Sequence, residues 1–424
     1  MRNHPLLKQL HASGIRLGLD RIRSFLNDLG SPHRCAPMVH IAGTNGKGSV
    51  CSMVDAMMQE SGYTSGMTLS PHLQHVNERI RIDGQPISDV ELDEVLGRVD
   101  AWAKAWGRTH LSLAPGELPL TYFEAMIAAA FLHFEKKNVG VGVVEVGLGG
   151  RLDATSVVHP AVSAVVSVGL DHMDRLGPDI ASVAFEKAGI FRGSAPAVVG
   201  EVSPIALRVL RDTAASRGTP LFVYGEDFSI SGHGSEFTWE MGSLRIEGLS
   251  VGLEGVFQRK NAAVALSIVE LLERSGVFTV PHAARRRGLA RVRHPGRLEW
   301  LTDELLVDGA HNIDSARVLA EHLSRMPWDR PRNLLLGLST DKDMRMIASA
   351  LAPQVDRIFT TRCAHPRAAS PEEIAEALTH LDLPVVVAGS VEEALPQIQL
   401  QPGMVVVAGS LFLAGAVRDL LGRS

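Results

Sequence analysis

Residues 41–49 read IAGTNGKGS, a glycine-rich turn that lies between a predicted strand and a predicted helix. The common phosphate-binding loop has a glycine, four free positions, and then Gly-Lys followed directly by Ser or Thr. Here Ile41 stands where that first glycine is expected, and Gly48 separates Lys47 from Ser49. This turn still favours phosphate binding over a tight turn with a solvated lysine. Its glycines allow backbone N–H groups to point at an anion, and a helix N-terminus and a lysine add positive charge.

The composition indicates a globular protein of two domains. The chain has 424 residues, with 45% hydrophobic, 21% charged and 5% aromatic residues and a formal net charge of −5. This charge gives no reason to expect nucleic acid or an anionic membrane as a partner. Three cysteines without a CxxC pair argue against a disulfide framework and a thiolate zinc site. Without a signal-peptide pattern at the N-terminus, we expect a cytoplasmic protein.

Short apolar runs alternate with amphipathic helical stretches, which is typical of a mostly parallel sheet with helices on both faces. Residues 222–256 alternate apolar and polar side chains instead, and predict a small antiparallel appendage. Pro295 and Gly296 break the pattern, so the expected domains are residues 1–294 and 295–424. The second domain repeats the α/β rhythm and resembles a dinucleotide fold, although no GxGxxG follows its first strand.

Polar residues follow several of the predicted strands. Ser70, Glu145 and His172 each come just beyond an apolar run, as Lys47 does. Ligands in open α/β sheets bind at the carboxyl ends of the strands, and a carboxylate such as that of Glu145 is costly to bury without a partner. Four such residues on one rim favour a site for a metal ion and a nucleotide over separate structural roles.

Other polar residues have two readings. His72 and His75 have the spacing of metal ligands, but Pro71 disfavours a helix and no third ligand follows, so a plain loop is favoured over a zinc site. Spacing alone favours a Lys187 that extends towards solvent and pairs with Glu186. In the second domain, Asp308 and His311 lie in a loop after a strand, and this pattern alone does not distinguish a ligand site from a capped turn.

With these pieces in place, the sequence resembles the folylpolyglutamate synthase/dihydrofolate synthase family of the Mur ligase superfamily. The matching motifs span residues 43–415 in the family's order: GTNGKGS, SPHL, NERI, TYFE, EVGLGGRLDAT, GLDH, EKAGI, HPGR, VDGAHN, DKD and GSLFLAG. GTNGKGS alone indicates the superfamily, whereas EVGLGGRLDAT followed by GLDH and EKAGI is much more specific. One departure is Phe257, which stands where the family usually has histidine before Gln258.

The resemblance implies an ATP-dependent ligase that phosphorylates the carboxylate of a pterin-containing acid, after which the amino group of L-glutamate attacks the acyl phosphate. It implies ATP and two Mg²⁺ ions, with Ser70, Glu145 and His172 as metal ligands. It assigns Lys47, His172 and Lys187 to catalysis. The residues implied to contact ATP are Gly43, Thr44, Asn45, Gly46, Lys47, Gly48, Ser49, Asn261, Arg297, Asp308 and His311.

The resemblance also reverses the interpretation of Lys187, because the matching lysine in similar ligases is carbamylated and then ligates a second Mg²⁺. Burial lowers the pKa of a lysine and so favours the neutral amine that this modification needs. Residues 111–120 and TYFE resemble the region that contacts the pterin. The residues implied to contact the substrate are Thr121, Phe123, Arg151 and Asp153.

We expect both activities of the family, with dihydropteroate, reduced folates and L-glutamate as substrates and a monomer as the working form. One alternative is folylpolyglutamate synthase activity alone. A second is a ligase that adds an amino acid to a UDP-muramyl substrate, which TYFE and GLGGRLDAT disfavour. A third, from another class, is a nucleotide-regulated binding or transport ATPase that hydrolyses ATP without glutamate.

Overall fold

The structure is a computed structural model, and it describes residues 4–10, 14, 16–110, 119–232, 234–363 and 365–423. The chain divides into two compact units, one of residues 1–252 with 258–293 and the other of residues 253–257 with 294–424. Residues 253–257, which the sequence placed in the first domain, therefore pack with the second unit.

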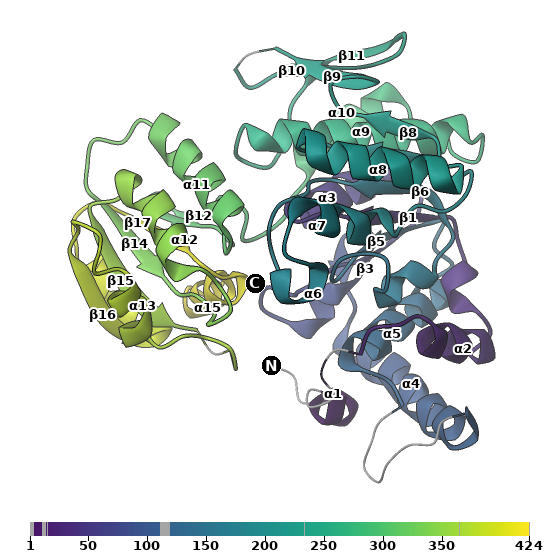
Figure 1. Cartoon of the computed structure of the whole chain (residues 1–424), viewed down its shortest axis with the longest axis horizontal. Helices are drawn as coiled ribbons and strands as arrows, with labels where there is room; N and C mark the ends of the chain where they lie inside the picture. Colours follow the sequence, from purple (N-terminus) through teal and green to yellow (C-terminus); the bar gives the residue numbers. More distant parts are fainter. Residues whose placement is uncertain are drawn as a thin grey trace. The chain divides into compact units, whose positions relative to one another are not determined.

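The first unit is built on an eight-stranded sheet (Figure 1). In spatial order its strands are β4 (Gln85–Pro86), β3 (Ile80–Ile82), β2 (Ser65–Thr68), β5 (Val141–Glu145), β1 (Met38–Ala42), β6 (Pro160–Val165), β7 (Ala197–Val199) and β8 (Leu221–Val223). Strands β2, β5, β1, β6, β7 and β8 are parallel, and β3 and β4 add an antiparallel edge. The prediction of a mostly parallel sheet is confirmed.

The helices of the first unit connect these strands. They are α1 (Pro5–Leu10), α2 (Asp20–Asp28), α3 (Lys47–Glu60), α4 (Asp89–His110), α5 (Tyr122–Lys136), α6 (Met173–Leu176), α7 (Ile180–Ala188), α8 (Pro204–Arg217), α9 (Phe257–Arg274) and α10 (His282–Arg291). Short 3-10 turns are η2 (Pro32–Arg34), η3 (Val76–Arg79) and η4 (Ala154–Val157).

The direction of each crossover decides which face a helix covers. From β1, the connection through α3 leads towards the β4 edge, whereas α5, α7 and α8 precede strands that lie in the opposite direction. Since such connections are right-handed, α3 covers one face and α5, α7 and α8 cover the other. The burial of β1 agrees, since Met38 belongs to the core cluster that includes α5 and Ala42 to the one that includes α7 and α8.

The predicted antiparallel appendage is the three-stranded sheet of β9 (Phe228–Ser231), β10 (Phe237–Met241) and β11 (Leu244–Leu249). Alternate side chains of β10 are buried, as expected for a sheet with one covered face. This sheet contacts α10 through β11.

The second unit has a six-stranded sheet, parallel except for its first strand. In spatial order its strands are β12 (Glu299–Thr302), β13 (Leu305–Val307), β17 (Met404–Ala408), β14 (Arg332–Leu336), β15 (Arg357–Arg362) and β16 (Val385–Ser390). Its helices are α11 (Ile313–Arg325), α12 (Met344–Leu351), α13 (Pro371–Ala377), α14 (Val391–Gln399) and α15 (Leu411–Leu420), with a 3-10 turn, η5 (Ala352–Gln354). The right-handed rule places α11, α12 and α13 on one face and α14 on the other. Phe257, at the first position of α9, packs against the core of this unit.

Helix α10 packs against α3, the helix that follows the glycine-rich loop, and one glycine sets how closely they approach. A Cβ added to Gly288 would lie 2.7 Å from both the backbone nitrogen and the Cα of Met57. We expect Gly288→Ala to lower the free energy of unfolding by about 1–3 kcal/mol, because backbone atoms cannot move aside as a flexible side chain can. Urea unfolding followed by circular dichroism measures this.

The matched control is Gly97→Ala in α4, where an added Cβ meets nothing within 4 Å. It should be neutral or stabilising, since alanine favours a helix by about 0.5–1 kcal/mol over glycine. Equal urea midpoints for the two variants would contradict the close approach of α10 to α3.

Candidate nucleotide and metal site

The glycine-rich loop connects β1 to α3, and its geometry requires glycine. Gly46 has φ of +84° and precedes the first residue of α3, Lys47. A Cβ at Gly46 would lie 2.7 Å from Oδ1 of Asn261, so a side chain there is excluded by space as well as by conformation. The loop therefore has the shape and the position, before a helix N-terminus, that an anion-binding turn needs.

The groups of this loop that face a ligand are backbone amides and one lysine. The first amide to bond back along α3 is that of Val50, which donates to the carbonyl of Gly46. The amides at the start of a helix have no acceptor within it and can bind an anion. Lys47 Nζ donates to the carbonyl oxygens of Gly43 (3.0 Å) and Thr44 (3.3 Å), and among the described residues no carboxylate pairs with it. Its positive charge is thus available to a phosphate.

Two residues of α9 extend this site. Nδ2 of Asn261 donates to Oε1 of Gln258 (2.8 Å), and Nε2 of Gln258 donates to Oγ of Ser49 (3.4 Å). Ser49 and Gln258 are both buried. The structure therefore brings the predicted Asn261 to the predicted loop, and it adds Gln258, which the sequence analysis did not single out.

A carboxylate ends β5, the strand next to β1, and a hydroxyl follows β2, the strand beyond β5. Glu145 ends β5 and is paired in register with Ile41 of β1, directly before the loop. Its Oε2 accepts a hydrogen bond from the backbone N–H of Ser70 (2.8 Å). The Oγ of Ser70 is buried and has no hydrogen-bond partner among the described residues.

A buried hydroxyl without a partner is unfavourable unless something binds it. Beside a buried carboxylate, it fits Mg²⁺, which prefers oxygen ligands and keeps several waters. The described residues contain no group of three His, Cys, Asp or Glu side chains that could hold a metal ion. These residues therefore suit an ion that is shared with phosphate oxygens and water, and do not form a closed protein cage.

Glu78 holds the loop that carries Ser70. Its carboxylate accepts hydrogen bonds from the backbone N–H groups of Leu73 (2.8 Å), Gln74 (2.9 Å) and His75 (2.7 Å). These three donors fold residues 73–78 into a compact turn. His75 therefore lies in a loop, as the sequence indicates.

Arg79 is a cation that the sequence analysis missed, although NERI contains it. Its Nε donates to Nδ1 of His72 (2.9 Å), and its guanidinium lies 5.5 Å from the ring centroid of Tyr122. Burial lowers its pKa, and the charges of Tyr122 and Glu145 oppose that shift. Arg79 is thus a second, half-buried cation of this region, and its charge interacts with that of Glu145.

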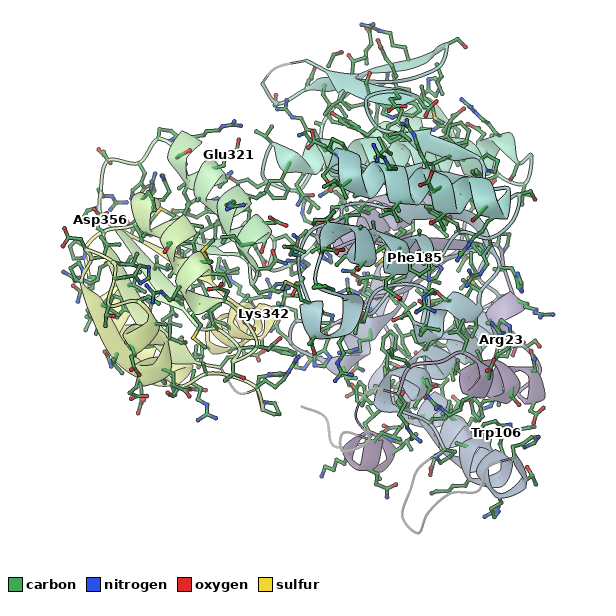
Figure 2. All side chains as sticks on the ribbon, in the orientation of Figure 1. Arg23, Trp106, Phe185, Glu321, Lys342 and Asp356 are labelled. Atoms are coloured by element: carbon green, nitrogen blue, oxygen red, sulfur yellow. The ribbon has the colours of Figure 1, made fainter. Side chains whose placement is uncertain are left out.

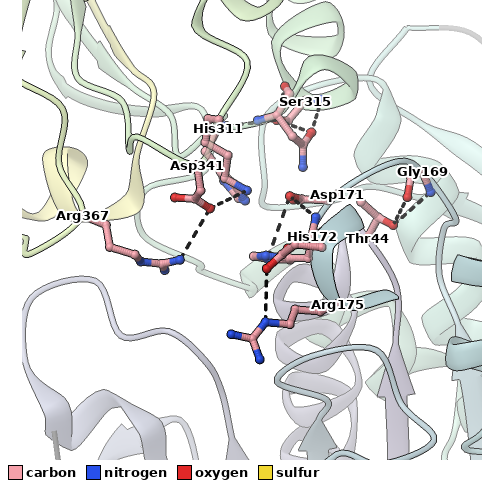
Figure 3. Close-up of polar contacts among 12 residues, drawn as sticks. Thr44, Gly169, Asp171, His172, Arg175, His311, Ser315, Asp341 and Arg367 are labelled. Atoms are coloured by element: carbon pink, nitrogen blue, oxygen red, sulfur yellow. Dashed lines mark hydrogen bonds and ion pairs between the residues drawn. The ribbon is translucent and has the colours of Figure 1, made fainter. Parts of the chain in front are cut away.

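His172 lies in the loop after β6. Its φ of +51° is in the left-handed region, which is uncommon for a residue other than glycine and marks a constrained position. Its backbone N–H donates to Oδ1 of Asp171 (2.9 Å), and its Nε2 lies 3.9 Å from the same oxygen (Figure 3). The imidazole is about one-third exposed, so it can reach a ligand.

Lys187 of α7 is buried, with 3% of its surface exposed. Burial and, secondarily, the positive charge of Lys47 lower its pKa from 10.5 to about 7, while Asp171 opposes the shift. A substantial fraction of Lys187 is therefore neutral near pH 7.

The interpretation of Lys187 as a lysine that pairs with Glu186 is wrong. Glu186 accepts hydrogen bonds from Nε (3.0 Å) and Nη2 (2.8 Å) of Arg151. The Arg151 guanidinium also lies 5.7 Å from the ring centroid of Phe185, which is about half exposed on α7 (Figure 2). Phe185 is exposed because it lies on the opposite side of the helix from the buried Lys187.

Two other predicted substrate residues, Thr121 and Phe123, make contacts within the protein. Thr121 caps the N-terminus of α5: its hydroxyl accepts from the backbone N–H of Glu124 and donates to Oε2 of the same residue. The ring of Phe123 covers Gly147, where an added Cβ would lie 2.5 Å from the ring. Residues 111–118, which the resemblance assigned to the pterin region, lie outside the described residues.

Asp153 lies in the loop after Gly147 and is buried. Its carboxylate accepts from the backbone N–H groups of Leu148 (2.9 Å) and Thr155 (3.0 Å) and from the Thr155 hydroxyl. Burial raises its pKa, and these hydrogen bonds oppose the rise. The contacts of Asp153 therefore shape the glycine-rich loop 147–150.

In the second unit, the predicted residues Arg297, Asp308 and His311 lie around one turn. The carboxylate of Asp308 accepts from the backbone N–H groups of Leu298 (2.9 Å) and Ala310 (2.8 Å), and burial raises its pKa while Arg297 lowers it. Nδ1 of His311 lies 2.7 Å from the carbonyl oxygen of Gly309. Asp308 thus joins the HPGR and VDGAHN segments within this unit.

Comparison with known proteins decides the family. Residues 296–411 match the family described as "Mur ligase, glutamate ligase domain". The folylpolyglutamate synthase of Lacticaseibacillus casei is 33% identical over 408 residues, which cover 95% of this chain and 94% of that protein. The chain belongs to the folylpolyglutamate synthase/dihydrofolate synthase family.

Other members of the family agree with this assignment. The dihydrofolate synthase/folylpolyglutamate synthase of Mycobacterium tuberculosis is 34% identical over 99% of this chain and 93% of its own length. A solved M. tuberculosis folylpolyglutamate synthase complexed with ADP has a TM-score of 0.90 at 32% identity, covering 99% of this chain and 97% of that one. The bifunctional enzyme of Yersinia pestis, complexed with AMPPNP and Mn, has a TM-score of 0.85 at 32% identity, covering 98% and 96%. The expected α/β fold with two Mur-ligase-like domains is confirmed.

Membership in the folylpolyglutamate synthase/dihydrofolate synthase family also bears on the classes left open by the sequence. It favours a ligase over a transport ATPase. Among the described residues, none of the helices combines the length and the apolarity that crossing a lipid bilayer requires.

Proposed function

We propose that this chain is an ATP-dependent ligase that joins L-glutamate to folate-type carboxylates, acting both on dihydropteroate and on the γ-glutamyl tail of reduced folates. The observation that carries the proposal is the buried, unpartnered Oγ of Ser70 beside Glu145, on the strand that neighbours the phosphate-type loop. This arrangement pairs metal-ligand chemistry with an anion cradle, as phosphoryl transfer requires.

The chain's own residues suit the first step, in which the substrate carboxylate attacks the γ-phosphorus of ATP and ADP leaves. The free amides at the start of α3 and the charge of Lys47 bind and orient the phosphates. Ser70, Glu145 and His172 would hold Mg²⁺, which supplies positive charge to the phosphoryl group when bound. Arg79, a half-buried cation whose charge interacts with that of Glu145, suits an anionic oxygen of the acyl substrate.

In the second step the amino group of L-glutamate attacks the acyl carbon, and phosphate leaves. The amine must be neutral to attack, so it loses a proton before or during this step. We further propose Lys187, carbamylated on its neutral amine, as a holder of a second Mg²⁺. The 3% exposure of this lysine and its lowered pKa support that role.

For ATP we propose Asn261 in the first unit and Arg297 in the second as contacts, with Asp308 and His311 of the second unit near the base, ribose or phosphates. Phe123, Arg151 and Asp153 remain proposed for the pterin side, with Phe123 as the stacking residue. Thr121 contributes there through the position of α5, because its hydroxyl caps that helix. We propose a cytoplasmic monomer as the working form.

The decisive measurement is phosphate release with ATP and Mg²⁺, using dihydropteroate or tetrahydrofolate as acceptor, each with and without L-glutamate. We expect glutamate-dependent release with both acceptors, and mass spectrometry should show each acceptor gaining one glutamyl residue. If dihydropteroate is inert, the enzyme only extends glutamate tails. Phosphate release that does not depend on L-glutamate would contradict the ligase assignment and favour an ATPase. Activity with a UDP-muramyl acceptor alone would favour the other ligase class.

A further inference from the structure

Five hydrogen bonds join the glycine-rich loop to the loop that follows β6, and we call this set the loop clamp. The backbone N–H of Thr44 donates to the carbonyl of Ser167 (3.0 Å), and the hydroxyl of Thr44 donates to the carbonyl of Gly169 (3.0 Å). That hydroxyl also accepts from the backbone N–H of Gly169 (2.9 Å). The backbone N–H of Asn45 donates to Oγ of Ser167 (2.9 Å), which donates to the carbonyl of Asn45 (2.8 Å).

The clamp leaves Thr44 without a proton for a phosphate oxygen. A hydroxyl has one proton to donate, and that of Thr44 goes to Gly169 (Figure 3). A phosphate oxygen accepts hydrogen bonds and has none to give, so the remaining lone pair of Thr44 cannot serve it. The backbone N–H groups of Thr44 and Asn45 are likewise directed at Ser167. The anion-facing amides of the loop therefore begin at Gly46.

The partner loop leads directly to a proposed metal ligand. Gly169 is buried and precedes His172 by three residues. His172 is held at φ of +51°, and Asp171 accepts its backbone N–H. Because the chain between Gly169 and His172 is short, the position of Gly169 limits where the imidazole can lie.

We propose that Thr44 and Ser167 are positioning residues that fix His172 for the metal ion relative to the phosphate-binding amides, and that neither side chain is a ligand of the nucleotide. The inference rests on the proposed metal and nucleotide site, and it deepens that site by assigning Ser167 and by changing the role of Thr44. The proposal implies that the two sites are coupled. Nucleotide bound at the amides from Gly46 onwards raises the affinity for metal at His172, and bound metal raises the affinity for nucleotide.

Direct binding measurements separate this role from nucleotide ligation. Mn²⁺ affinity is measured by electron paramagnetic resonance of free Mn²⁺ with saturating AMPPNP, and ADP affinity is measured by calorimetry in EDTA. We expect Thr44→Val to weaken Mn²⁺ binding roughly tenfold or more, as loss of a residue that orients a metal ligand typically does. ADP affinity without metal should stay unchanged within error.

Thr44→Ser is the conservative variant, and it should restore Mn²⁺ affinity because its hydroxyl can make both bonds to Gly169. Ser167→Ala tests the other half of the clamp and should weaken Mn²⁺ in the same direction. It carries the test if Thr44→Val does not fold, as judged by thermal unfolding. Ser61→Ala is the matched control, since its hydroxyl donates to Met57 at the far end of α3.

Two results would overturn the proposal. One is a loss of metal-free ADP affinity in Thr44→Val as large as its loss of Mn²⁺ affinity, which would make Thr44 a nucleotide ligand. The other is unchanged Mn²⁺ affinity in both folded clamp variants. Neither measurement uses a folate or glutamate, so failure of the clamp can be told apart from failure of the proposed ligase activity.

Discussion

Lys47→Ala is expected to lower the turnover number by on the order of 10²–10³ or more, because it removes a preorganised charge at the migrating phosphoryl group. The lysine donates only to two backbone carbonyls of its own loop, at 3.0 and 3.3 Å. Its ammonium is therefore held in place without being neutralised by a carboxylate among the described residues. The readout is phosphate release with saturating ATP, acceptor and L-glutamate.

The fold should survive this change, since the side chain of Lys47 contributes no core packing. The matched control is Lys104→Ala, which removes an exposed lysine that pairs with Asp100 one turn away on α4. It should leave turnover unchanged, and both variants should unfold at the temperature of the parent protein. Near-normal turnover of Lys47→Ala would contradict the phosphate assignment of the whole loop.

Lys187→Met is expected to reduce turnover by on the order of 10²-fold or more, if the lysine holds a metal ion as a carbamate. Only the neutral amine reacts with carbon dioxide, and the amine's pKa of about 7 provides it near neutrality. Intact mass measured in bicarbonate under non-denaturing conditions should show one added carboxyl group. The modified fraction should fall as the pH drops below about 7, where the amine becomes protonated.

The unmodified lysine also predicts how stability depends on pH in buffer free of carbon dioxide. Its pKa is depressed in the folded state, so between about pH 7 and 10.5 the unfolded chain binds a proton that the folded chain does not. The free energy of unfolding should therefore gain a positive slope with pH across this window, and Lys187→Met should remove it. The carbamate would be contradicted if the protein showed its unmodified mass in bicarbonate and Lys187→Met kept full activity. Lys136→Met, at the surface, serves as the control.

Local patterns predicted the parts of this molecule that depend on neighbours in sequence. The turn at Gly46 follows from glycine between an apolar run and an amphipathic run. The positions of Glu145 at the end of its strand and of His172 beyond its strand follow from the same alternation of elements. Parallel strands end at one rim, so residues after those strands could be grouped without knowing the order of the strands.

Contacts between distant segments could not be predicted in this way. Glu186 directly precedes Lys187 in sequence, yet it pairs with Arg151, which lies in a loop 35 residues earlier. The hydroxyl of Thr44 bonds to Gly169, and no local pattern indicates a partner 125 residues away. Thr121 followed by Glu124 is the pattern of a capping box, and that signal could have shown its structural role.

The strand order of the first unit has a consequence for how the chain folds during synthesis. The central strand β1 is made early, but its neighbours β5 and β6 end only at Glu145 and Val165. More than a hundred residues must therefore leave the ribosome before β1 is paired on both sides, and contacts so distant in sequence form slowly. Until then the apolar strand that precedes the glycine-rich loop is without its sheet partners, and it is one of the exposed segments of the nascent chain that a holding chaperone could bind.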